Sequence, residues 1–268
     1  MILKGKNAVI FGAGGSLGGA VARMFSQAGA TVYLSGRTLT SVQKVAEDVK
    51  ASGGKAEAAE VDATDEHAVN SYLDSVVSEA GTLDVCFNLI GWQDTQDTPL
   101  TKMSLVDFAR PIKIAMETQF LTSTAAGRMM MKQKSGVILS LTATPGGIGY
   151  PGVGGFGPAC CAVEGFSRNL ASELGVYGIR VINIRSAGSP DSRPFVEALA
   201  NGGDEVNDFI SKLEEDTMLK ELPEMADIAN VATFLASDQA GKITGVTIDV
   251  TCGTTAGLNS KVCAIPFR

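Results

Sequence analysis

A glycine-rich turn near the N-terminus constrains the fold of this chain more than any other stretch. Residues Gly12–Gly19 (Gly-Ala-Gly-Gly-Ser-Leu-Gly-Gly) follow a short apolar run, Asn7–Phe11, and precede a helical pattern over Ala20–Ala28. A buried strand that turns sharply into a helix leaves unpaired N–H groups at the helix N-terminus, where an anion is favoured. Gly12 permits the tight turn, and Gly18 lets helix and strand pack closely. The pattern predicts dinucleotide binding; the alternative is a packing turn without a ligand.

Strand and helix patterns alternate along the rest of the chain. Further strands are expected at Thr31–Ser35, Ala56–Val61, Asp84–Asn88, Gly136–Leu141, Ile179–Ile184 and Gly245–Val250. This order predicts an α/β fold: a Rossmann-like, doubly wound parallel sheet with helices on both faces. The chain has 268 residues, of which 45% are hydrophobic, enough for one large core. We therefore expect a single domain over residues 1–268.

Two segments depart from the regular pattern. Residues 189–222 are richer in charged and turn residues and contain the run Asn201-Gly-Gly203, which predicts a mobile helical flap over the substrate rather than a second domain. Residues 105–132 have a helical pattern, but Pro111 cannot donate the interior hydrogen bond. We therefore expect a short helix, a break, and a long helix from about Pro111.

Composition excludes several classes of function. The net charge is −7, and no run of Lys or Arg exceeds two residues, which argues against binding to nucleic-acid phosphates. No apolar run approaches the roughly 20 residues that cross a bilayer, so we expect no membrane partner. The five cysteines show neither metal-ligand spacing nor a dense disulfide pattern. We therefore expect no metal site and a reduced, cytoplasmic protein.

The end of the second predicted strand indicates which dinucleotide binds. An NAD-type site commonly places a carboxylate there, to bind the ribose 2′-hydroxyl. This chain has Gly36 followed by Arg37. A guanidinium binds a 2′-phosphate through paired hydrogen bonds, so we expect NADP(H). The alternative is a solvated arginine that begins a helix.

Other residues at predicted strand ends extend the expected cofactor site. Asp62 follows the third strand, where its side chain can reach the adenine amino group, and Asn88–Gly91 (Asn-Leu-Ile-Gly) follows the fourth. The expected cofactor contacts are Gly12, Ser16, Leu17, Gly18, Arg37, Asp62, Ala63, Asn88 and Gly91. Trp92 comes next and either lines a substrate pocket or covers the sheet edge. His67, the single histidine, lies at a predicted helix start and is expected at the surface, which argues against general-base chemistry by histidine.

Taken together, these motifs resemble the short-chain dehydrogenase/reductase family over nearly the whole chain. The resemblance rests on the glycine turn, Asp62, Asn88–Gly91, Ala162–Phe166 (Ala-Val-Glu-Gly-Phe), Gly178–Val181 (Gly-Ile-Arg-Val) and Ala229–Gly253. It implies hydride transfer between nicotinamide C4 and a carbonyl or alcohol, and a homotetramer or homodimer built from long helices. Ser16 departs from the pattern, because it stands where the family has its middle glycine. Its hydroxyl could bond a phosphate.

The resemblance also implies a catalytic set that this sequence lacks. The family uses a Tyr to move the hydroxyl proton, a Lys one helical turn later, a Ser that orients the substrate, and an Asn that anchors a water relay. The Ala-Val-Glu-Gly motif fixes the register and places Phe156 at the Tyr and Cys160 at the Lys. Ala143 stands at the Ser and Ala115 at the Asn, although both placements could shift by one residue. Thr142 could then supply the missing hydroxyl.

Few residues could replace the missing acid. Tyr150, in the loop before the helix, is a weak catalytic candidate because no lysine is nearby to lower its pKa; the alternative is a loop-packing tyrosine. Cys160 has an apolar, helical setting that raises a thiol pKa, so a buried core residue is favoured over a nucleophile or acid. Pro158 requires this helix to begin near Gly154–Gly157. The expected substrate pocket comprises Trp92, Ala143, Phe156 and Cys160.

Three functions follow from this pattern. The first is an NADP(H)-dependent oxidoreductase with an atypical active site, which reduces an iminium ion or an activated alkene rather than a simple ketone. The second is a catalytically silent NADP(H)-binding pseudoenzyme that acts as a sensor, a scaffold or a partner subunit. The third, elimination or isomerisation, is the weakest because no acid–base pair is evident.

Overall fold

The computed structural model describes residues 1–201 and 203–257 and contains a seven-stranded sheet in the order β3-β2-β1-β4-β5-β6-β7. All neighbouring strands pair in parallel. The strands are β1 (Asn7–Phe11), β2 (Thr31–Gly36), β3 (Lys55–Glu60), β4 (Val85–Asn88), β5 (Gly136–Ala143), β6 (Ile179–Ser186) and β7 (Thr247–Val250). The predicted Rossmann-like fold is therefore confirmed. The part of the predicted domain beyond residue 257 lies outside the described residues.

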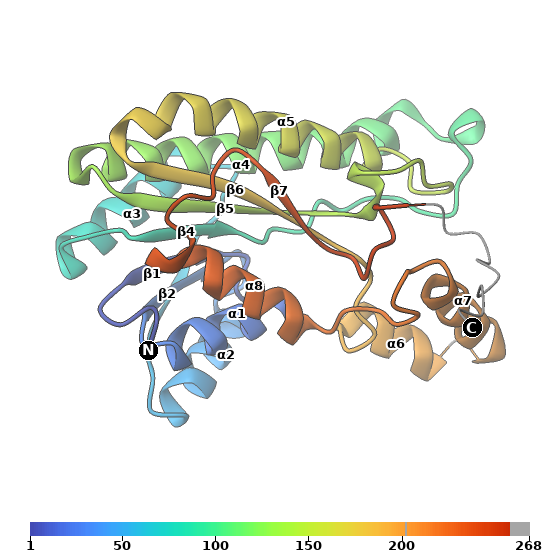
Figure 1. Ribbon diagram of the computed structural model, residues 1–268, viewed down its shortest axis with the longest axis horizontal. Helices are drawn as coiled ribbons and strands as arrows, with labels where there is room; N and C mark the ends of the chain where they lie inside the picture. Colours follow the sequence, from blue (N-terminus) through green and yellow to red (C-terminus); the bar gives the residue numbers. More distant parts are fainter. Residues whose placement is uncertain (202, 258–268) are drawn as a thin grey trace, which may run out of the picture.

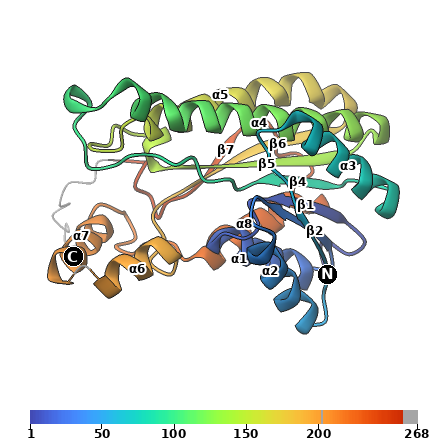
Figure 2. The ribbon, with the colours of Figure 1, turned by 180° about the vertical axis from the view of Figure 1, so that it is seen from behind.

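Helices cover both faces of the sheet (Figure 1; Figure 2). One face carries α1 (Ser16–Gln27), α2 (Leu39–Ala51) and α8 (Met225–Ala236), and the other carries α3 (Glu66–Ala80), α4 (Leu105–Gln133) and α5 (Phe156–Leu174). Each layer has its own apolar core. Phe25 and Leu235 belong to the first core, and Leu73, Met130 and Leu174 belong to the second. With both faces covered, ligands of such a sheet bind at the carboxyl ends of the strands.

The strand register brings the predicted site residues to one edge. Phe11, the last residue of β1, pairs with Ser35 of β2 on one side and with Asn88 of β4 on the other. The strand order reverses at β1, because the chain leaves β3 at the sheet edge and returns to β4 beside β1. Ligands of open α/β sheets bind at such a switch point. The glycine turn, which follows Phe11, lies there.

The predicted helix break at Pro111 is wrong, because α4 continues without interruption from Leu105 to Gln133. Proline removes one N–H donor, so a single interior hydrogen bond is missing. The Pro111 ring is buried, and its packing offsets that loss. Ser104 also stabilises the helix start, since its hydroxyl accepts a hydrogen bond from the Asp107 N–H at 3.1 Å.

The start of α5 agrees with the sequence prediction. The helix begins at Phe156, so Pro158 lies in the first turn, where it removes no interior bond. Gly155 precedes the helix, and a Cβ there would collide with the carbonyl oxygen of Phe108 in α4. This glycine therefore lets the N-terminus of α5 lie directly against α4. The close approach fixes the position of Phe156 relative to the sheet.

The segment from 189 to 222 contains two helices, with loops before and after them. It forms α6 (Arg193–Asn201) and α7 (Gly203–Glu215), which lie to one side of the sheet near the end of β7 (Figure 1). Asp191 links the segment to α8, since its carboxylate accepts a hydrogen bond from the Met225 N–H at 3.1 Å. Its role as a substrate flap stays a prediction.

Candidate functional site

A cavity of about 640 Å³ lies at the carboxyl ends of β1, β2, β3 and β4. Eight of the nine residues expected to contact the cofactor line it: Gly12, Ser16, Leu17, Gly18, Arg37, Asp62, Ala63 and Gly91. These residues come from four separate strand ends and converge on one space. The cavity is larger than the lower limit of about 300 Å³ typical of ligand pockets.

Asn88 differs from this group because it does not line the cavity. Its side chain is buried, and its Nδ2 donates to the Thr122 hydroxyl at 3.0 Å. Its Oδ1 accepts a hydrogen bond from the Ile90 N–H at 3.0 Å. Asn88 therefore holds the loop whose residues Leu89, Ile90 and Gly91 form the cavity wall. These hydrogen bonds give Asn88 a structural role in shaping that wall, while its direct contact with the cofactor stays a prediction.

The glycine turn has the geometry of a cradle. Gly12 has φ of +80°, and a Cβ there would lie 2.5 Å from the Leu89 carbonyl oxygen. A Cβ on Gly18 would lie 2.5 Å from the Gly12 carbonyl oxygen. Both positions therefore require glycine, the first for its backbone conformation and both for space. The absent side chains leave the N-terminus of α1 open to an anion, so these residues fit a dinucleotide pyrophosphate.

Arg37 supplies positive charge at the β2 end of the cavity. Its side chain is exposed and forms no hydrogen bond or ion pair with the described residues. Asp62 lies nearby, and the Thr64 N–H at 2.9 Å and hydroxyl at 2.7 Å both donate to its Oδ1. These two bonds lower the Asp62 pKa below its ordinary value, and the positive charge of Arg37 adds to the effect. A free guanidinium therefore stands beside an ionised carboxylate.

Ser16 joins the glycine turn to the flap. Its Oγ accepts a hydrogen bond from the Arg193 N–H, at the start of α6, at 3.0 Å. Ser192, Arg193 and Pro194 line the same cavity as the turn. The sequence did not indicate this second wall, because the flap is 177 residues away along the chain. The hydroxyl proton of Ser16 remains available to donate to a phosphate.

The four residues at the family's catalytic positions gather in one apolar cluster, which we call the apolar catalytic cluster. Its buried members are Trp92, Ala115, Ala159, Cys160 and Val163, and the partly buried Ala143, Phe156, Ile112, Ile114 and Met116 pack against them. The Trp92 and Phe156 rings lie 5.3 Å apart. Burial raises the pKa of the Cys160 thiol to about 12, as expected for an apolar setting. The indole N–H of Trp92 is buried and has no acceptor among the described residues.

The four residues of the expected substrate pocket all lie in this cluster, and their contact with a substrate stays a prediction. Trp92, Ala143, Phe156 and Cys160 do come together, but none of them lines either of the two large cavities. Trp92 is only 6% exposed and Cys160 is fully buried. These side chains bury one another's apolar surface, since contact among Phe, Trp and small residues removes that surface from water.

Thr142 also has a structural position. Its hydroxyl donates to Glu164 Oε1 at 2.9 Å and accepts from Asn183 Nδ2 at 2.8 Å. Glu164 in turn binds Arg185, whose Nη2 lies 2.6 Å from Glu164 Oε2, and Arg185 also binds Asp249. This network ties α5 to β5, β6 and β7. The Thr142 hydroxyl proton is therefore engaged with Glu164, and a catalytic role for Thr142 stays a prediction.

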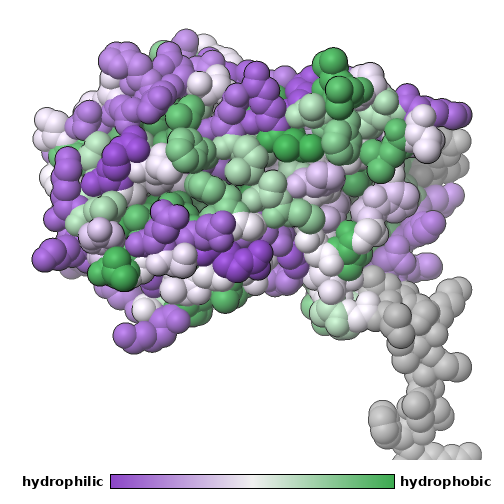
Figure 3. Space-filling view, turned by 90° about the horizontal axis from the view of Figure 1, so that it is seen from above, coloured by the Kyte–Doolittle hydropathy of each residue, from purple (hydrophilic) through white to green (hydrophobic). Residues whose placement is uncertain are grey.

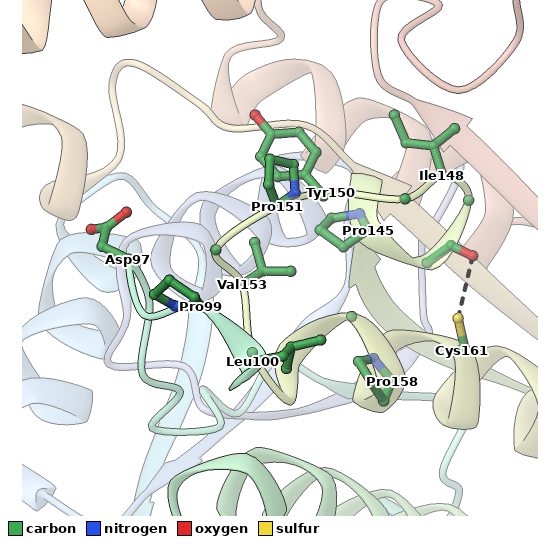
Figure 4. Close-up of a pocket in the computed structure, with 16 residues that line it drawn as sticks. Asp97, Pro99, Leu100, Pro145, Ile148, Tyr150, Pro151, Val153, Pro158 and Cys161 are labelled. Carbon is green, nitrogen blue, oxygen red and sulfur yellow. Dashed lines mark hydrogen bonds between the residues drawn. The ribbon is translucent and has the colours of Figure 1, made fainter. Parts of the chain in front are cut away.

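A second, larger cavity of about 910 Å³ lies beside the N-terminus of α5. Its walls come from residues 97–100 and from the loop between β5 and α5 (Figure 4). Tyr150 lines it, and burial, followed by the negative charge of Asp216, raises the Tyr150 pKa. A raised pKa keeps the phenol protonated, which suits a proton donor and not a base. Tyr150 forms no hydrogen bond with the described residues.

Several site residues were not evident from the sequence. Asp97 lines the larger cavity and has φ of +58°, and the Glu164–Arg185–Asp249 network lies behind its wall. Asp97 stands in a polar run, Gln93–Thr98, whose composition indicates only a loop. Arg185 lies near the end of a mostly apolar strand, and a charge at that position indicates a buried ion pair.

Comparisons with known proteins give a consistent result. A family model described as enoyl-(acyl carrier protein) reductase matches residues 12–255. The chain is 30% identical to the 3-oxoacyl-(acyl-carrier-protein) reductase FabG of Staphylococcus aureus strain Mu50 over 254 residues, which cover 92% of this chain and 97% of FabG. It is 31% identical to secoisolariciresinol dehydrogenase of Forsythia intermedia, across 91% of this chain and 86% of that enzyme. A solved xylitol dehydrogenase with NAD⁺ bound is 26% identical, with a TM-score of 0.86, and covers 93% of this chain and 99% of its own.

The fold and the cavity at the switch point define a Rossmann-type protein of the dinucleotide-binding class. The family model and the similarity to FabG both cover nearly the whole chain, and together they identify its family. The chain belongs to the short-chain dehydrogenase/reductase family, a family of oxidoreductases whose members use nicotinamide cofactors.

The described residues contain neither a metal-ligand cluster nor a membrane-spanning helix. Within residues 1–201 and 203–257, no three His, Cys, Asp or Glu residues are grouped so as to hold a metal ion. No helix in the same ranges is long and apolar enough to span a bilayer. Cys86, Cys160, Cys161 and Cys252 are free thiols, while Cys263 lies outside the described residues. His67 is exposed at the start of α3, as predicted.

The outer face of α4 and α5 carries apolar side chains among polar ones (Figure 3). Phe120 of α4 is 54% exposed, and its ring lies 6.3 Å from that of Phe166 in α5. Leu105 and Val106, at the start of α4, are also exposed. These helices are the ones expected to build a homotetramer or homodimer, which stays a prediction.

Proposed function

We propose that this chain is an NADP(H)-dependent oxidoreductase with an atypical active site, which reduces an iminium ion or an activated alkene. The observation that carries the proposal is a contrast within one molecule. The cofactor cavity keeps its glycine cradle and a free Arg37, whereas the family's proton-transfer positions form the apolar catalytic cluster. A site that binds the cofactor but lacks a proton relay suits substrates that need none.

The chemistry of the two substrate classes explains this choice. A bound reduced nicotinamide supplies hydride from C4. An iminium carbon that accepts the hydride becomes a neutral amine, because the π electron pair of the C=N bond moves to nitrogen, and no proton donor is required. An activated alkene takes hydride at its β carbon and then needs one proton. Tyr150 or solvent can supply that proton, and the raised pKa of Tyr150 keeps its phenol protonated.

NADP(H) is favoured over NAD(H) by charge. No acidic side chain follows Gly36, and the unpaired guanidinium of Arg37 can bind a 2′-phosphate through paired hydrogen bonds. The relatives do not decide the point, since the solved xylitol dehydrogenase holds NAD⁺. Arg193, on the flap wall of the cavity, adds a second positive charge.

Titration calorimetry on the full chain tests the cofactor preference. We expect NADPH to bind more tightly than NADH, and Arg37→Ala to weaken NADPH binding by about 10- to 100-fold while leaving NADH binding unchanged, since hydrogen bonds to charged groups contribute about 1.5–3 kcal/mol. Arg168→Ala is the matched control, because Arg168 is exposed on α5 and outside the cavity. Equal affinities for the two cofactors would refute the preference. NADPH oxidation is then followed across panels of iminium ions, activated alkenes and ketones.

A silent NADP(H)-binding protein is the second candidate, and a specific observation favours it. The Trp92–Phe156 contact and the fully buried Cys160 close the region where the family transfers protons. Such a protein would act as a sensor, a scaffold or a partner subunit. Turnover that Arg37→Ala abolishes would exclude this candidate, whereas NADPH binding without oxidation across all three panels would support it.

We also propose that the protein is a cytoplasmic homo-oligomer that joins through α4 and α5. The exposed Phe120 and its neighbour Phe166 support this arrangement, since paired aromatic rings are enriched at interfaces. Sedimentation analysis of the full chain and of Phe120→Glu tests the oligomer. We expect the variant to dissociate, and an unchanged mass would contradict the proposed interface.

A further inference from the structure

We propose that the larger cavity binds an organic cation, an iminium ion or the protonated amine related to it, and that Asp97 selects for the positive charge. The inference rests on the proposed function for the reaction that a bound iminium ion would undergo. Binding of the cation can be tested separately from that reaction. It chooses between the two substrate classes and names a specificity residue outside the cofactor site.

The cavity has an apolar body. Six of its apolar wall residues are Pro99, Leu100, Pro145, Ile148, Val153 and Pro158. Figure 4 shows these side chains around the space, drawn from two separate loops and the first turn of α5. A volume of about 910 Å³ lies within the range of drug-sized ligand sites. A ligand with a hydrocarbon ring or chain would bury its surface here.

Asp97 is the one charged side chain among the described residues that line the cavity. Asp97, Tyr150 and Cys161 are its ionisable residues, and no Lys, Arg or His is among the described residues that line it. The Asp97 carboxylate forms no hydrogen bond or ion pair with any described residue. An anionic ligand would therefore meet an uncompensated negative charge, whereas a cation would find a free partner.

The ion-paired group behind the wall carries a net negative charge, although its arginine lies nearest to the cavity. Gly146 and Gly147 leave the wall bare, and a Cβ on Gly147 would lie 2.7 Å from Arg185 Nη1. Arg185 is held by the carboxylates of Glu164 and Asp249, so two negative charges and one positive charge leave this group with a net charge of −1.

Tyr150, on the cavity wall, is close enough to the Asp216 carboxylate to be affected by its charge. The negative charge of Asp216 contributes to the raised Tyr150 pKa. This part of the molecule therefore presents several negative charges around an apolar space. No single acidic residue carries the inference, since the cavity, the bare wall and the missing cation act together.

The backbone fixes Asp97 at the rim. Its N–H donates to the Gly152 carbonyl at 2.8 Å, which joins the two loops that form the cavity walls. Its φ of +58° lies in the left-handed region that Asn and Asp tolerate best. Asp97→Asn therefore removes the charge and keeps both the shape and the backbone conformation, so loss of folding does not confuse the test.

The experiment compares three ligands of similar shape by calorimetry on the full chain, with and without saturating NADP⁺, so that no turnover occurs. The ligands are the 2-methyl-3,4-dihydroisoquinolinium cation, the neutral 2-methyl-3,4-dihydroisoquinolin-1-one and the anionic 3,4-dihydronaphthalene-2-carboxylate. We expect the cation to bind at least fivefold more tightly than the lactam and the carboxylate to bind most weakly. Asp97→Asn should reduce cation affinity about fivefold and leave lactam affinity unchanged. Asp74→Asn, which removes an exposed charge from α3, should change neither.

The outcomes separate this inference from the proposed function. Equal affinity for cation and lactam, or an Asp97→Asn variant with wild-type preference, would overturn the inference. Cation binding that needs Asp97, without any oxidation of NADPH, would uphold it and refute the proposed catalysis. Reduction of alkenes by a protein that does not prefer the cation would uphold the proposed catalysis and refute the inference.

Discussion

The cofactor cavity and the apolar catalytic cluster lie at the same edge of one sheet but differ in chemistry. The first has bare glycines, a free arginine and a carboxylate fixed by two hydrogen bonds. The second has aromatic rings, alanines and a buried thiol. The first region keeps charged side chains, and the second is apolar apart from the Trp92 indole N–H and the Cys160 thiol. Binding and proton transfer are therefore separable in this fold, because they depend on different strand ends and helices.

The largest effect should come from a charge placed in the cluster. Cys160→Asp buries a carboxylate beside Glu164, and we expect a loss of about 3–5 kcal/mol in the free energy of unfolding at pH 7. Burial raises the carboxyl pKa in the folded state, so the folded protein binds more protons than the unfolded one and stability should recover as the pH falls towards 4. Urea unfolding at several pH values measures both effects.

The neighbouring cysteine provides the control. Cys161→Asp places the same charge one residue further, where the side chain is exposed, and should change the free energy of unfolding by less than about 0.5 kcal/mol. Similar losses in both variants would show that the first turns of α5, and not the cluster, are sensitive to charge.

A methyl group in the glycine cradle should have the next largest effect. Gly12→Ala combines a positive φ with a collision against Leu89, and we expect a loss of about 2–4 kcal/mol in stability together with loss of NADPH binding. Gly53→Ala has nearly the same φ, +81°, but open space around it, and should cost about 1 kcal/mol with no change in binding. Chemical denaturation and calorimetry measure the two quantities. NADPH affinity that survives in Gly12→Ala would refute the cradle.

A smaller effect should follow from separating the turn and the flap. Ser16→Ala removes the acceptor of the Arg193 N–H, and we expect that amide to exchange faster with solvent by an amount equivalent to about 1 kcal/mol. Hydrogen exchange detected by NMR measures this. Ser78→Ala, on the exposed side of α3, serves as the control. An unchanged Arg193 amide would show that the flap is held by other contacts.

The smallest effect concerns the ionisation of Asp62. Thr64→Val removes the hydroxyl donor and should raise the Asp62 pKa towards its ordinary value of 3.8, while Thr64→Ser should restore the low value. Because the folded pKa is depressed, the contribution of Asp62 to stability is fully present above pH 3.8 and is lost as the pH falls through the folded pKa. An NMR titration of the Asp62 carboxyl measures the shift.

The fold and the cofactor cavity could be predicted from local sequence. Short apolar runs that end in glycine and alternate with helical patterns determine a parallel sheet, and the strand ends then bring Gly12, Arg37 and Asp62 to one edge. Asn88 shows the limit of that reasoning. Position at a strand end was predicted, but the direction of its side chain depends on Thr122, which lies on α4.

The rest of the site could not be predicted because it depends on contacts between distant segments. The predicted helix break at Pro111 is wrong, because the packing of the buried proline ring outweighs the lost hydrogen bond. The residues expected to form a pocket around Trp92 pack together as the apolar catalytic cluster. The larger cavity lies between two loops instead. The hydroxyl of Thr142 was taken by Glu164 and Asn183, neither of which is close to it in sequence.

The position of Trp92 also makes the protein its own optical reporter. It is the only tryptophan of the chain, and its indole is buried against an aromatic ring without a polar partner among the described residues. Such surroundings shift indole fluorescence to short wavelengths, and the signal comes from one known place. Stopped-flow measurement of Trp92 emission will therefore report ligand binding at the apolar catalytic cluster without any label. Its rate can be compared with the rate of ligand binding at the glycine turn.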